Sequence, residues 1–205
     1  MNKGRGRPPA GGPDARAAIC AAASDLFLER GYTAATVREI ARRAGYDVAL
    51  VSYYFGSKGE LFAEVMLLTL GPSQVLKEAL VGDPSTLAPR LVARVIIAWE
   101  DPHAGPQLGR LAREAIANAD LLPALRGYLD RELMVPLVEY FGGHHATEQA
   151  AATIAVVIGM IFSRYVIALD HVTKVSPALY VQTMVPVLAQ AATGRRPNRP
   201  ASKRP

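Results

Sequence analysis

The sequence predicts an all-α fold, with a helix-turn-helix near the N-terminus and a longer helical region behind it. Half of the 205 residues are hydrophobic but only 7% are aromatic, a balance that favours helices over stacked sheets. Apolar residues recur at helical spacing along most of the chain. Glycine, proline and capping residues divide this pattern into segments of helical length.

The basic residues are concentrated at the two ends of the chain. The 23 Lys and Arg residues include eight in segments 1–13 and 195–205, which contain no acid, so the rest has 15 basic and 18 acidic residues. We therefore expect disordered basic tails over 1–13 and 194–205. This distribution excludes a uniformly basic nucleic-acid coat but is compatible with basic arms on a nearly neutral body.

The helix-turn-helix is predicted within residues 14–70. The first helix begins near Asp14 and has Gly31 as its C-cap. Thr36-Val37-Arg38-Glu39 fits a capping box, in which the Thr side chain bonds the amide of the Glu and the Glu side chain reaches back. The helix that follows ends around Ala44-Gly45.

Two further helices complete this region. Asp47 can cap a short helix over 48–55, and Ser57-Lys58-Gly59-Glu60 is a second capping box that opens another helix. Short helices at this spacing, with a glycine in the tight turn, are typical of a helix-turn-helix.

The pattern remains helical beyond Gly71-Pro72, and residues 71–193 are expected to form a second domain. Pro136 should kink or split one of its helices. The expected helices are 72–81, 85–100, 106–118, 121–141, 147–169 and 176–192.

The segment Thr36–Leu61, TVREIARRAGYDVALVSYYFGSKGEL, resembles the TetR family of bacterial regulators. The resemblance is specific over about residues 15–66 and weaker over the rest of the chain. It implies that helix 48–55 is a recognition helix, which enters the major groove of double-stranded operator DNA. It also implies a homodimer, whose two recognition helices would read a palindromic site.

The recognition helix has a predicted inner and outer face. If Val51 and Phe55 point inward, small and apolar residues that can approach base edges point outward, and the tyrosines can contact phosphates. The alternative for the tyrosines is packing in a small core. The candidate DNA-binding residues of this helix are Val48, Ala49, Leu50, Ser52, Tyr53 and Tyr54.

Candidate contacts also lie outside the recognition helix. Arg38 and Lys58 stand in the first turn of a helix, where a cation opposes the helix dipole unless an anion such as phosphate lies close. By resemblance, Arg38 can read a guanine edge. The alternative for both is a solvated surface charge. Thr36 is expected to cap its helix and contact phosphate.

The Gly4–Pro9 segment is similar to a minor-groove AT-hook core, which makes Arg5 and Arg7 candidates for the minor groove. The alternative is that this segment is only a solubilising tail.

The second domain is expected to bind a small effector and to dimerise. Small residues in helix 147–169 permit close packing, and with helix 176–192 they predict a four-helix interface, the alternative being burial within one subunit. The resemblance implies an effector pocket, whose apolar and aromatic candidates favour a hydrophobic effector, although most could equally be core. These candidates are Trp99, Arg113, Tyr128, Met134, Met160, Phe162 and Tyr165.

Several classes of function are disfavoured. A single cysteine, Cys20, permits no intramolecular disulfide and fits a reducing cytoplasm. The most apolar run, Gln149–Ser163, has 15 residues, whereas a bilayer span needs roughly 20. The four histidines do not stand at metal-ligand spacing, and we expect no metal site, cofactor or catalytic residue.

The sequence therefore predicts a DNA-binding transcriptional regulator, and the resemblance implies that it is a repressor that a small hydrophobic effector releases from its operator. The alternatives are an architectural DNA-binding protein without an effector and a helical-bundle enzyme.

Overall fold

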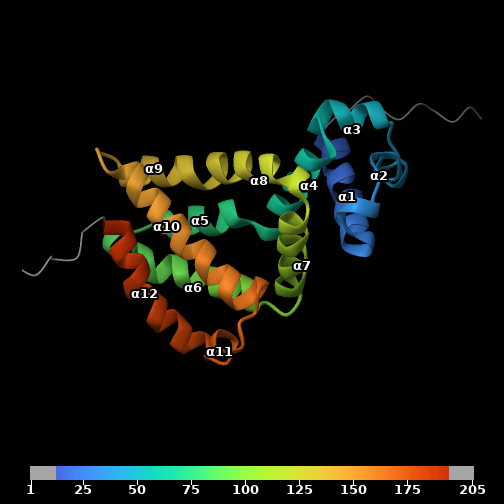
Figure 1. Cartoon of the computed structure of the whole chain (residues 1–205). Coiled ribbons are helices and arrows are strands. Elements are labelled where there is room, and N and C mark those ends of the chain that lie inside the picture. Colours follow the sequence, from blue (N-terminus) through green and yellow to red (C-terminus); the bar gives the residue numbers. More distant parts are fainter. Residues whose placement is uncertain (1–12, 194–205) are drawn as a thin grey trace, which may run out of the picture. The chain divides into compact units, whose positions relative to one another are not determined.

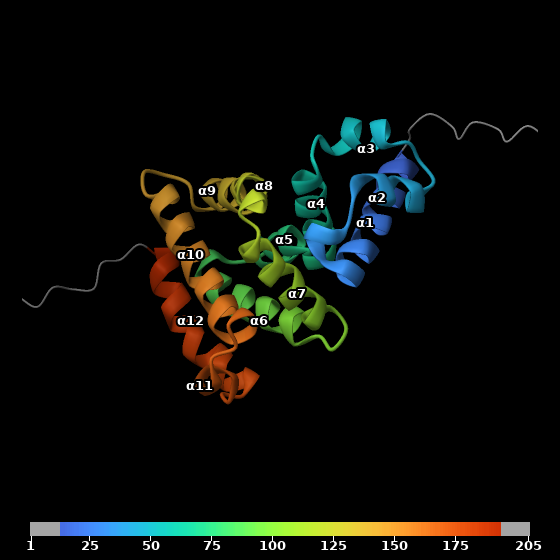
Figure 2. The same cartoon turned by 45° about the vertical axis from the view of Figure 1, so that its right-hand side comes forward.

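The computed structural model describes residues 13–193, except for the side chains of residues 13, 66–70 and 72. Every regular element in this range is helical, and the range contains no strand (Figures 1 and 2). The all-α prediction is therefore confirmed. The predicted tails, including Arg5 and Arg7, lie outside the described residues, although Pro13 already begins the first helix.

Packing divides the chain into two compact units. The first comprises the described residues up to Gly71 together with Pro106–Gly127, and the second comprises Pro72–Gly105 and the described residues from Tyr128 onward. The end of the first stretch lies close to the boundary expected near residue 70. The sequence pattern did not indicate that Pro106–Gly127 packs with the N-terminal helices.

The first unit is built on a small apolar core. Buried side chains from helices far apart in the sequence meet there, including Ile19, Ile40, Val51, Phe62 and Leu111. The Phe27 and Phe62 rings meet edge to face, with 5.0 Å between their centroids. The helices are α1 (Pro13–Ala34), α2 (Val37–Ala44), α3 (Val48–Phe55), α4 (Lys58–Leu70) and α7 (Ala104–Ala117), followed by the first part of α8 (Leu122–Leu129).

Helix α1 is broken at the predicted glycine but does not end there. Gly31 has φ 78° and ψ 167°, outside the helical region, and a further turn continues to Ala34. A positive φ favours glycine because it has no Cβ.

The second unit has its own core, which contains Leu91, Val95, Leu137, Met160 and Leu188. Helix α6 packs on α5 and α12, and α10 packs on α9 and α12; both views show α10 and α12 side by side (Figures 1 and 2). The helices are α5 (Pro72–Leu80), α6 (Leu87–Glu100), α9 (Val135–Phe141), α10 (Ala146–Ile161), α11 (Asp170–Thr173) and α12 (Pro177–Thr193).

The helix expected at 121–141 changes its hydrogen bonding next to Pro136 rather than ending there. The segment Asp130–Met134 between α8 and α9 is π-helical, with the Val135 amide donating to the Asp130 carbonyl, and Pro136 lies in the first turn of α9. Proline has no amide hydrogen to donate, so the regular α-helical pairing cannot continue through it. A second π-helical segment, Phe162–Val166, follows α10, and the short helix α11 was not predicted.

Helix α10 and the segment after it form a continuous apolar helix, Ala146–Val166, of 21 residues, within which an 18-residue stretch has a mean hydropathy of 1.5. By length and composition it could cross a membrane, so the argument from the shorter run Gln149–Ser163 does not hold. A single such helix is weak evidence, because core helices of soluble proteins have the same length and composition.

Candidate nucleic-acid interface

The turn between α2 and α3 is held by local hydrogen bonds that the sequence predicted in part. Gly45 is left-handed (φ 78°), and its amide donates to the carbonyls of Ala41 and Arg42. The Asp47 carboxylate then accepts from the amide of Ala49 at 2.7 Å, which caps α3. These bonds set the direction in which α3 leaves the turn.

Helix α3 has the two faces that its sequence predicts. Val51 and Phe55 are buried, with 2% and 7% of their surface exposed. Val48, Ala49, Ser52 and Tyr53 are exposed, and Leu50 and Tyr54 are partly buried at the margins. The buried pair anchors the helix to the core, so the opposite face is presented to a partner.

The two tyrosines of α3 differ in their surroundings. Tyr53 is 81% exposed, which is unusual for a large aromatic side chain. Tyr54 packs partly against the core of the first unit. Their rings meet edge to face with 5.4 Å between centroids. Packing in the core, the alternative considered for both tyrosines, therefore describes Tyr54 in part and does not describe Tyr53.

The start of α2 presents Thr36 and Arg38. The Thr36 hydroxyl accepts from the amide of Glu39 at 3.2 Å, as predicted. The prediction that the Glu39 side chain reaches back to complete the capping box is wrong, because its carboxylate instead accepts from Arg30 at 2.6 Å. Arg38 is exposed and, within residues 13–193, is in no ion pair.

The Lys58 side chain packs against the end of α1, whereas the sequence suggested a cation that extends freely toward phosphate. Its Nζ is 4.2 Å from the centroid of the Tyr32 ring and 3.5 Å from the carbonyl oxygen of Thr33. Burial lowers the pKa of Lys58, and the nearby charge of Glu114 opposes that effect. The ammonium is thus held at the end of α1, beside the N-terminus of α4. The Ser57 hydroxyl caps α4, as predicted, by accepting from the amide of Glu60.

The effector-pocket candidates do not all fall in one place. Trp99 and Tyr165 stack with 5.3 Å between ring centroids, and both border the core of the second unit that contains Met160. Met134 borders the same core, Phe162 is half-buried, and Tyr128 is fully buried. Arg113 belongs to the first unit, where it lines a groove against α1.

Metal chemistry receives no support from the described part of the chain. Within it, no group of three or more His, Cys, Asp or Glu side chains is placed to hold a metal ion.

A capped helix-turn-helix with an outward helix face, followed by a helical region, defines the class of DNA-binding transcriptional regulators. The family model described as bacterial regulatory proteins, tetR family, matches residues 19–65, and the model described as tetracyclin repressor-like, C-terminal domain, matches residues 85–191. The chain therefore belongs to the TetR family of transcriptional regulators, as its sequence suggested.

Similar proteins are regulators as well. The chain is 31% identical to the HTH-type transcriptional repressor Rv3405c of Mycobacterium tuberculosis over 139 residues. This aligned region covers 63% of this chain and 68% of that protein. It is 47% identical over 51 residues to the HTH-type transcriptional dual regulator CecR of Shigella flexneri, 25% of this chain and 22% of that protein.

Solved structures share the fold. A TetR-family regulator from Streptomyces coelicolor A3 matches with a TM-score of 0.70 and 24% identity, over 92% of this chain and 99% of that chain. NalD of Pseudomonas aeruginosa, the secondary repressor of the MexAB-OprM multidrug efflux pump, matches with a TM-score of 0.56 and 21% identity, over 86% and 94% of the two chains.

Proposed function

We propose that this regulator is a homodimeric repressor that binds palindromic operator DNA and leaves it when a small hydrophobic effector binds. The exposed face of α3, opposite the buried Val51 and Phe55, carries the proposal. Ala49 and Ser52 permit close approach to base edges, and Val48 can contact a thymine methyl group. The repressor-type name of the mycobacterial relative supports repression.

Residues flanking α3 would position it on the duplex. Thr36, Arg38, Tyr53, Tyr54 and Lys58 supply hydroxyl groups and positive charge, the groups that contact phosphates in protein–DNA complexes. Arg38, exposed at the start of α2, has the reach and the donors for a guanine edge. We retain Arg5 and Arg7 as candidate minor-groove contacts on sequence grounds alone.

A direct test starts from random duplexes. The purified full-length protein would select bound duplexes from a random library, and sequencing would reveal the preferred site. The proposal expects an inverted repeat whose half-sites are about one helical turn apart. The Ser52→Arg variant, which places a long cation on the outer face of α3, should change or abolish the enrichment. Enrichment without any sequence preference would instead support the architectural alternative.

Dimerisation would use α10 and α12. These helices pack on each other, yet α10 leaves Ala151, Ala155 and Gly159 exposed, and α12 exposes Leu179 and Val187. Small side chains let helices approach closely, and a Cβ added at Gly159 would meet only open space. A second copy placed on this face would complete a four-helix interface.

The effector would bind in the second unit, near Trp99, Tyr128, Met160 and Tyr165. The Tyr128 hydroxyl is buried without a hydrogen-bond partner among the described residues, and burial raises its pKa. An unsatisfied buried donor costs about 1–3 kcal/mol, which a polar atom of the effector could recover.

A screen of hydrophobic compounds for release of the selected duplex tests this part of the proposal. Tyr128→Phe should weaken the response to a compound that carries a hydrogen-bond acceptor. The same variant should not change affinity for the duplex without the compound.

A further inference from the structure

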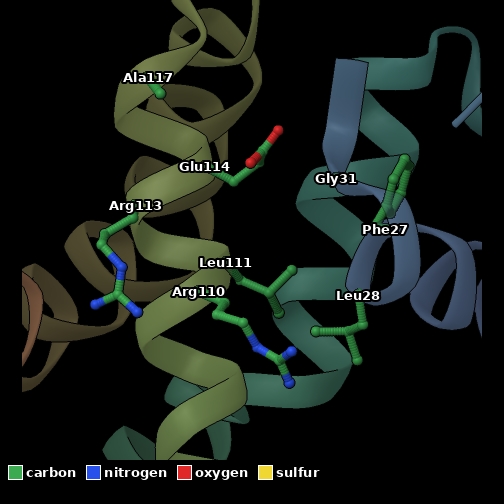
Figure 3. A pocket seen from close by; sticks show the side chains of 8 residues that line it. All are labelled: Phe27, Leu28, Gly31, Arg110, Leu111, Arg113, Glu114 and Ala117. Carbon is green, nitrogen blue, oxygen red and sulfur yellow. The ribbon is translucent and has the colours of Figure 1, made fainter. Parts of the chain in front are cut away.

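The end of α1 is held by a residue 82 positions later in the sequence. The Glu114 carboxylate, on α7, accepts a hydrogen bond from the backbone amide of Tyr32 at 2.7 Å. Both helices line a groove of about 350 Å³. Figure 3 shows the carboxylate pointing from α7 toward Gly31. The neighbouring Arg113 points away from α1 in the same view.

The break at Gly31 explains why the Tyr32 amide needs this partner. Amides at an interruption lose the regular pairing of the helix and must find acceptors elsewhere. A carboxylate is a strong acceptor, because hydrogen bonds to charged groups are about twice as strong as neutral ones. Glycine is required at position 31 by its positive φ of 78° rather than by lack of space, because a Cβ added there would make only an ordinary contact, 3.4 Å from Glu114 Oε1.

Asn118, one turn further along, reinforces the contact. Its Nδ2 donates to the Glu114 carbonyl at 2.8 Å and to Glu114 Oε1 at 3.3 Å. Its Oδ1 accepts from the Thr33 hydroxyl at 3.1 Å. Two side chains of the α7 end therefore hold two consecutive residues at the end of α1.

The same two residues of α1 hold Lys58. The Tyr32 ring lies under the Lys58 ammonium and meets Phe62 edge to face, and the Thr33 carbonyl accepts a hydrogen bond from that ammonium. Lys58 is a candidate phosphate contact at the N-terminus of α4. A shift of Tyr32 would therefore displace the support of that cation.

We propose that Glu114 is a positioning residue for DNA binding, which acts through Tyr32 on Lys58. The inference rests on the proposed function, because it assigns Lys58 to phosphate.

The test compares two variants that remove the same charge. Glu114→Gln keeps a side-chain acceptor for the Tyr32 amide, and Glu114→Ala removes it. Any difference between the two variants therefore measures the effect of losing the hydrogen bond to the Tyr32 amide, because both lose the negative charge. Glu78→Ala is the matched control, because it removes a paired carboxylate from the second unit.

Affinity for the selected duplex is the first measurement. Glu114→Ala should bind about ten-fold more weakly, which corresponds to about 1.4 kcal/mol, and Glu114→Gln and Glu78→Ala should remain within about two-fold of the unmodified protein. The slope of log K against log salt should fall by about one in Glu114→Ala, the loss expected for one phosphate contact. Adding Glu114→Ala to Lys58→Ala should have little further effect, because residues that act through one contact are not additive.

Amide hydrogen exchange of the full-length protein without DNA is the second measurement. Glu114→Ala should exchange faster in peptides that cover residues 28–36, whereas Glu114→Gln should not. Unchanged exchange in Glu114→Ala, or effects of Glu114→Ala and Lys58→Ala that simply add, would overturn the inference. If the unmodified protein selects no duplex, the proposed function fails, and the exchange result still decides whether Glu114 holds Tyr32.

Discussion

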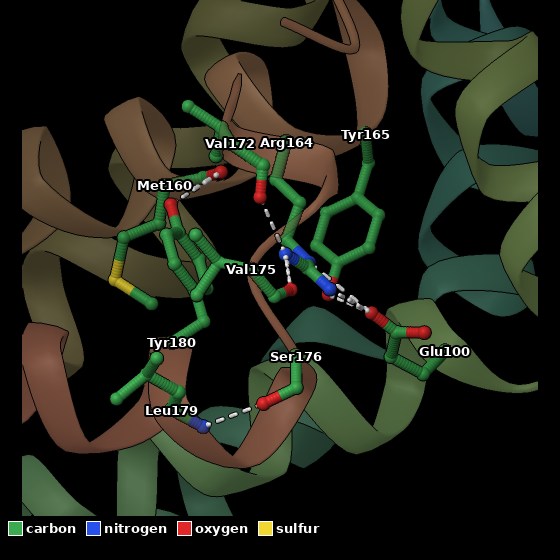
Figure 4. Close-up of polar contacts among 9 residues, drawn as sticks. All are labelled: Glu100, Met160, Arg164, Tyr165, Val172, Val175, Ser176, Leu179 and Tyr180. Atoms are coloured by element: carbon green, nitrogen blue, oxygen red, sulfur yellow. Dashed lines mark hydrogen bonds and ion pairs between the residues drawn. The ribbon is translucent and has the colours of Figure 1, made fainter. Parts of the chain in front are cut away.

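The Arg164 guanidinium and the Glu100 carboxylate form an ion pair in the second unit, with 3.0 Å between Nη2 and Oε1. Arg164 also donates from Nη1 to the carbonyls of Val172 and Val175, each at 2.8 Å (Figure 4). The Tyr165 hydroxyl donates to the same carboxylate oxygen at 2.9 Å. One side chain thus joins the end of α6 to the segment that leads into α12.

Loss of Arg164 should destabilise the second unit more than loss of Glu100. Arg164 is only 6% exposed, whereas the Glu100 side chain is 38% exposed and can be solvated by water. Arg164→Ala should cost about 3 kcal/mol in unfolding free energy, because it removes the ion pair and leaves the carbonyls of Val172 and Val175 without their donor. Glu100→Gln should cost less, about 1–2 kcal/mol, since it keeps an acceptor for the guanidinium and removes only the opposite charge. Urea unfolding of both variants measures this order, and equal losses would contradict it.

Arg38 and Lys58 should differ in what they contribute to DNA binding. Arg38→Ala should relax the preference at one base pair, at a cost of about 1–3 kcal/mol there, because a base-edge contact carries sequence information. Lys58→Ala should weaken binding to all duplexes about equally, because a phosphate contact carries none.

A panel of single-base variants of the selected duplex separates the two roles. Arg42→Ala is the control, since Arg42 is an exposed arginine one turn further along α2. A changed base preference in Lys58→Ala would refute its assignment to phosphate.

The exposed face of α10 should be necessary for the dimer. Ala155→Arg would bury two unpaired cations in the proposed interface, one from each subunit. Since an unpaired buried charge costs roughly 3–5 kcal/mol, we expect the dissociation constant of the dimer to rise at least about 100-fold. Sedimentation velocity at micromolar protein measures the change. Val81→Arg is the control, because Val81 is 76% exposed and lies outside α10 and α12. A dimer that survives Ala155→Arg would place the interface elsewhere.

Cys20 should be inert in the folded protein. Its side chain is 3% exposed in the core of the first unit, and burial, with a smaller effect of the Glu64 charge, raises its pKa to about 11. Thiolate is the reactive form, so alkylation by iodoacetamide at pH 8 should be very slow until the protein unfolds. Mass spectrometry with and without denaturant measures the labelling. Rapid labelling of the native protein would show that this part of the core opens readily.

The sequence alone determined the features that depend on neighbouring residues. Thr36, Asp47 and Ser57 cap the helices that they were expected to cap, because a capping side chain bonds an amide only two or three residues away. The faces of α3 followed from helical spacing, which places Val51 and Phe55 on one side. The family resemblance was carried by the same short segment.

Only the tertiary structure decided the contacts between residues distant in the sequence. Glu39 pairs with Arg30 rather than completing its capping box, because packing of α2 on α1 brings that arginine within reach. Glu114 meets Tyr32 across 82 residues, and nothing in the local pattern of either segment indicates the other. A side chain–backbone bond of this kind has no periodicity, and its partners are brought together only when the whole unit has folded.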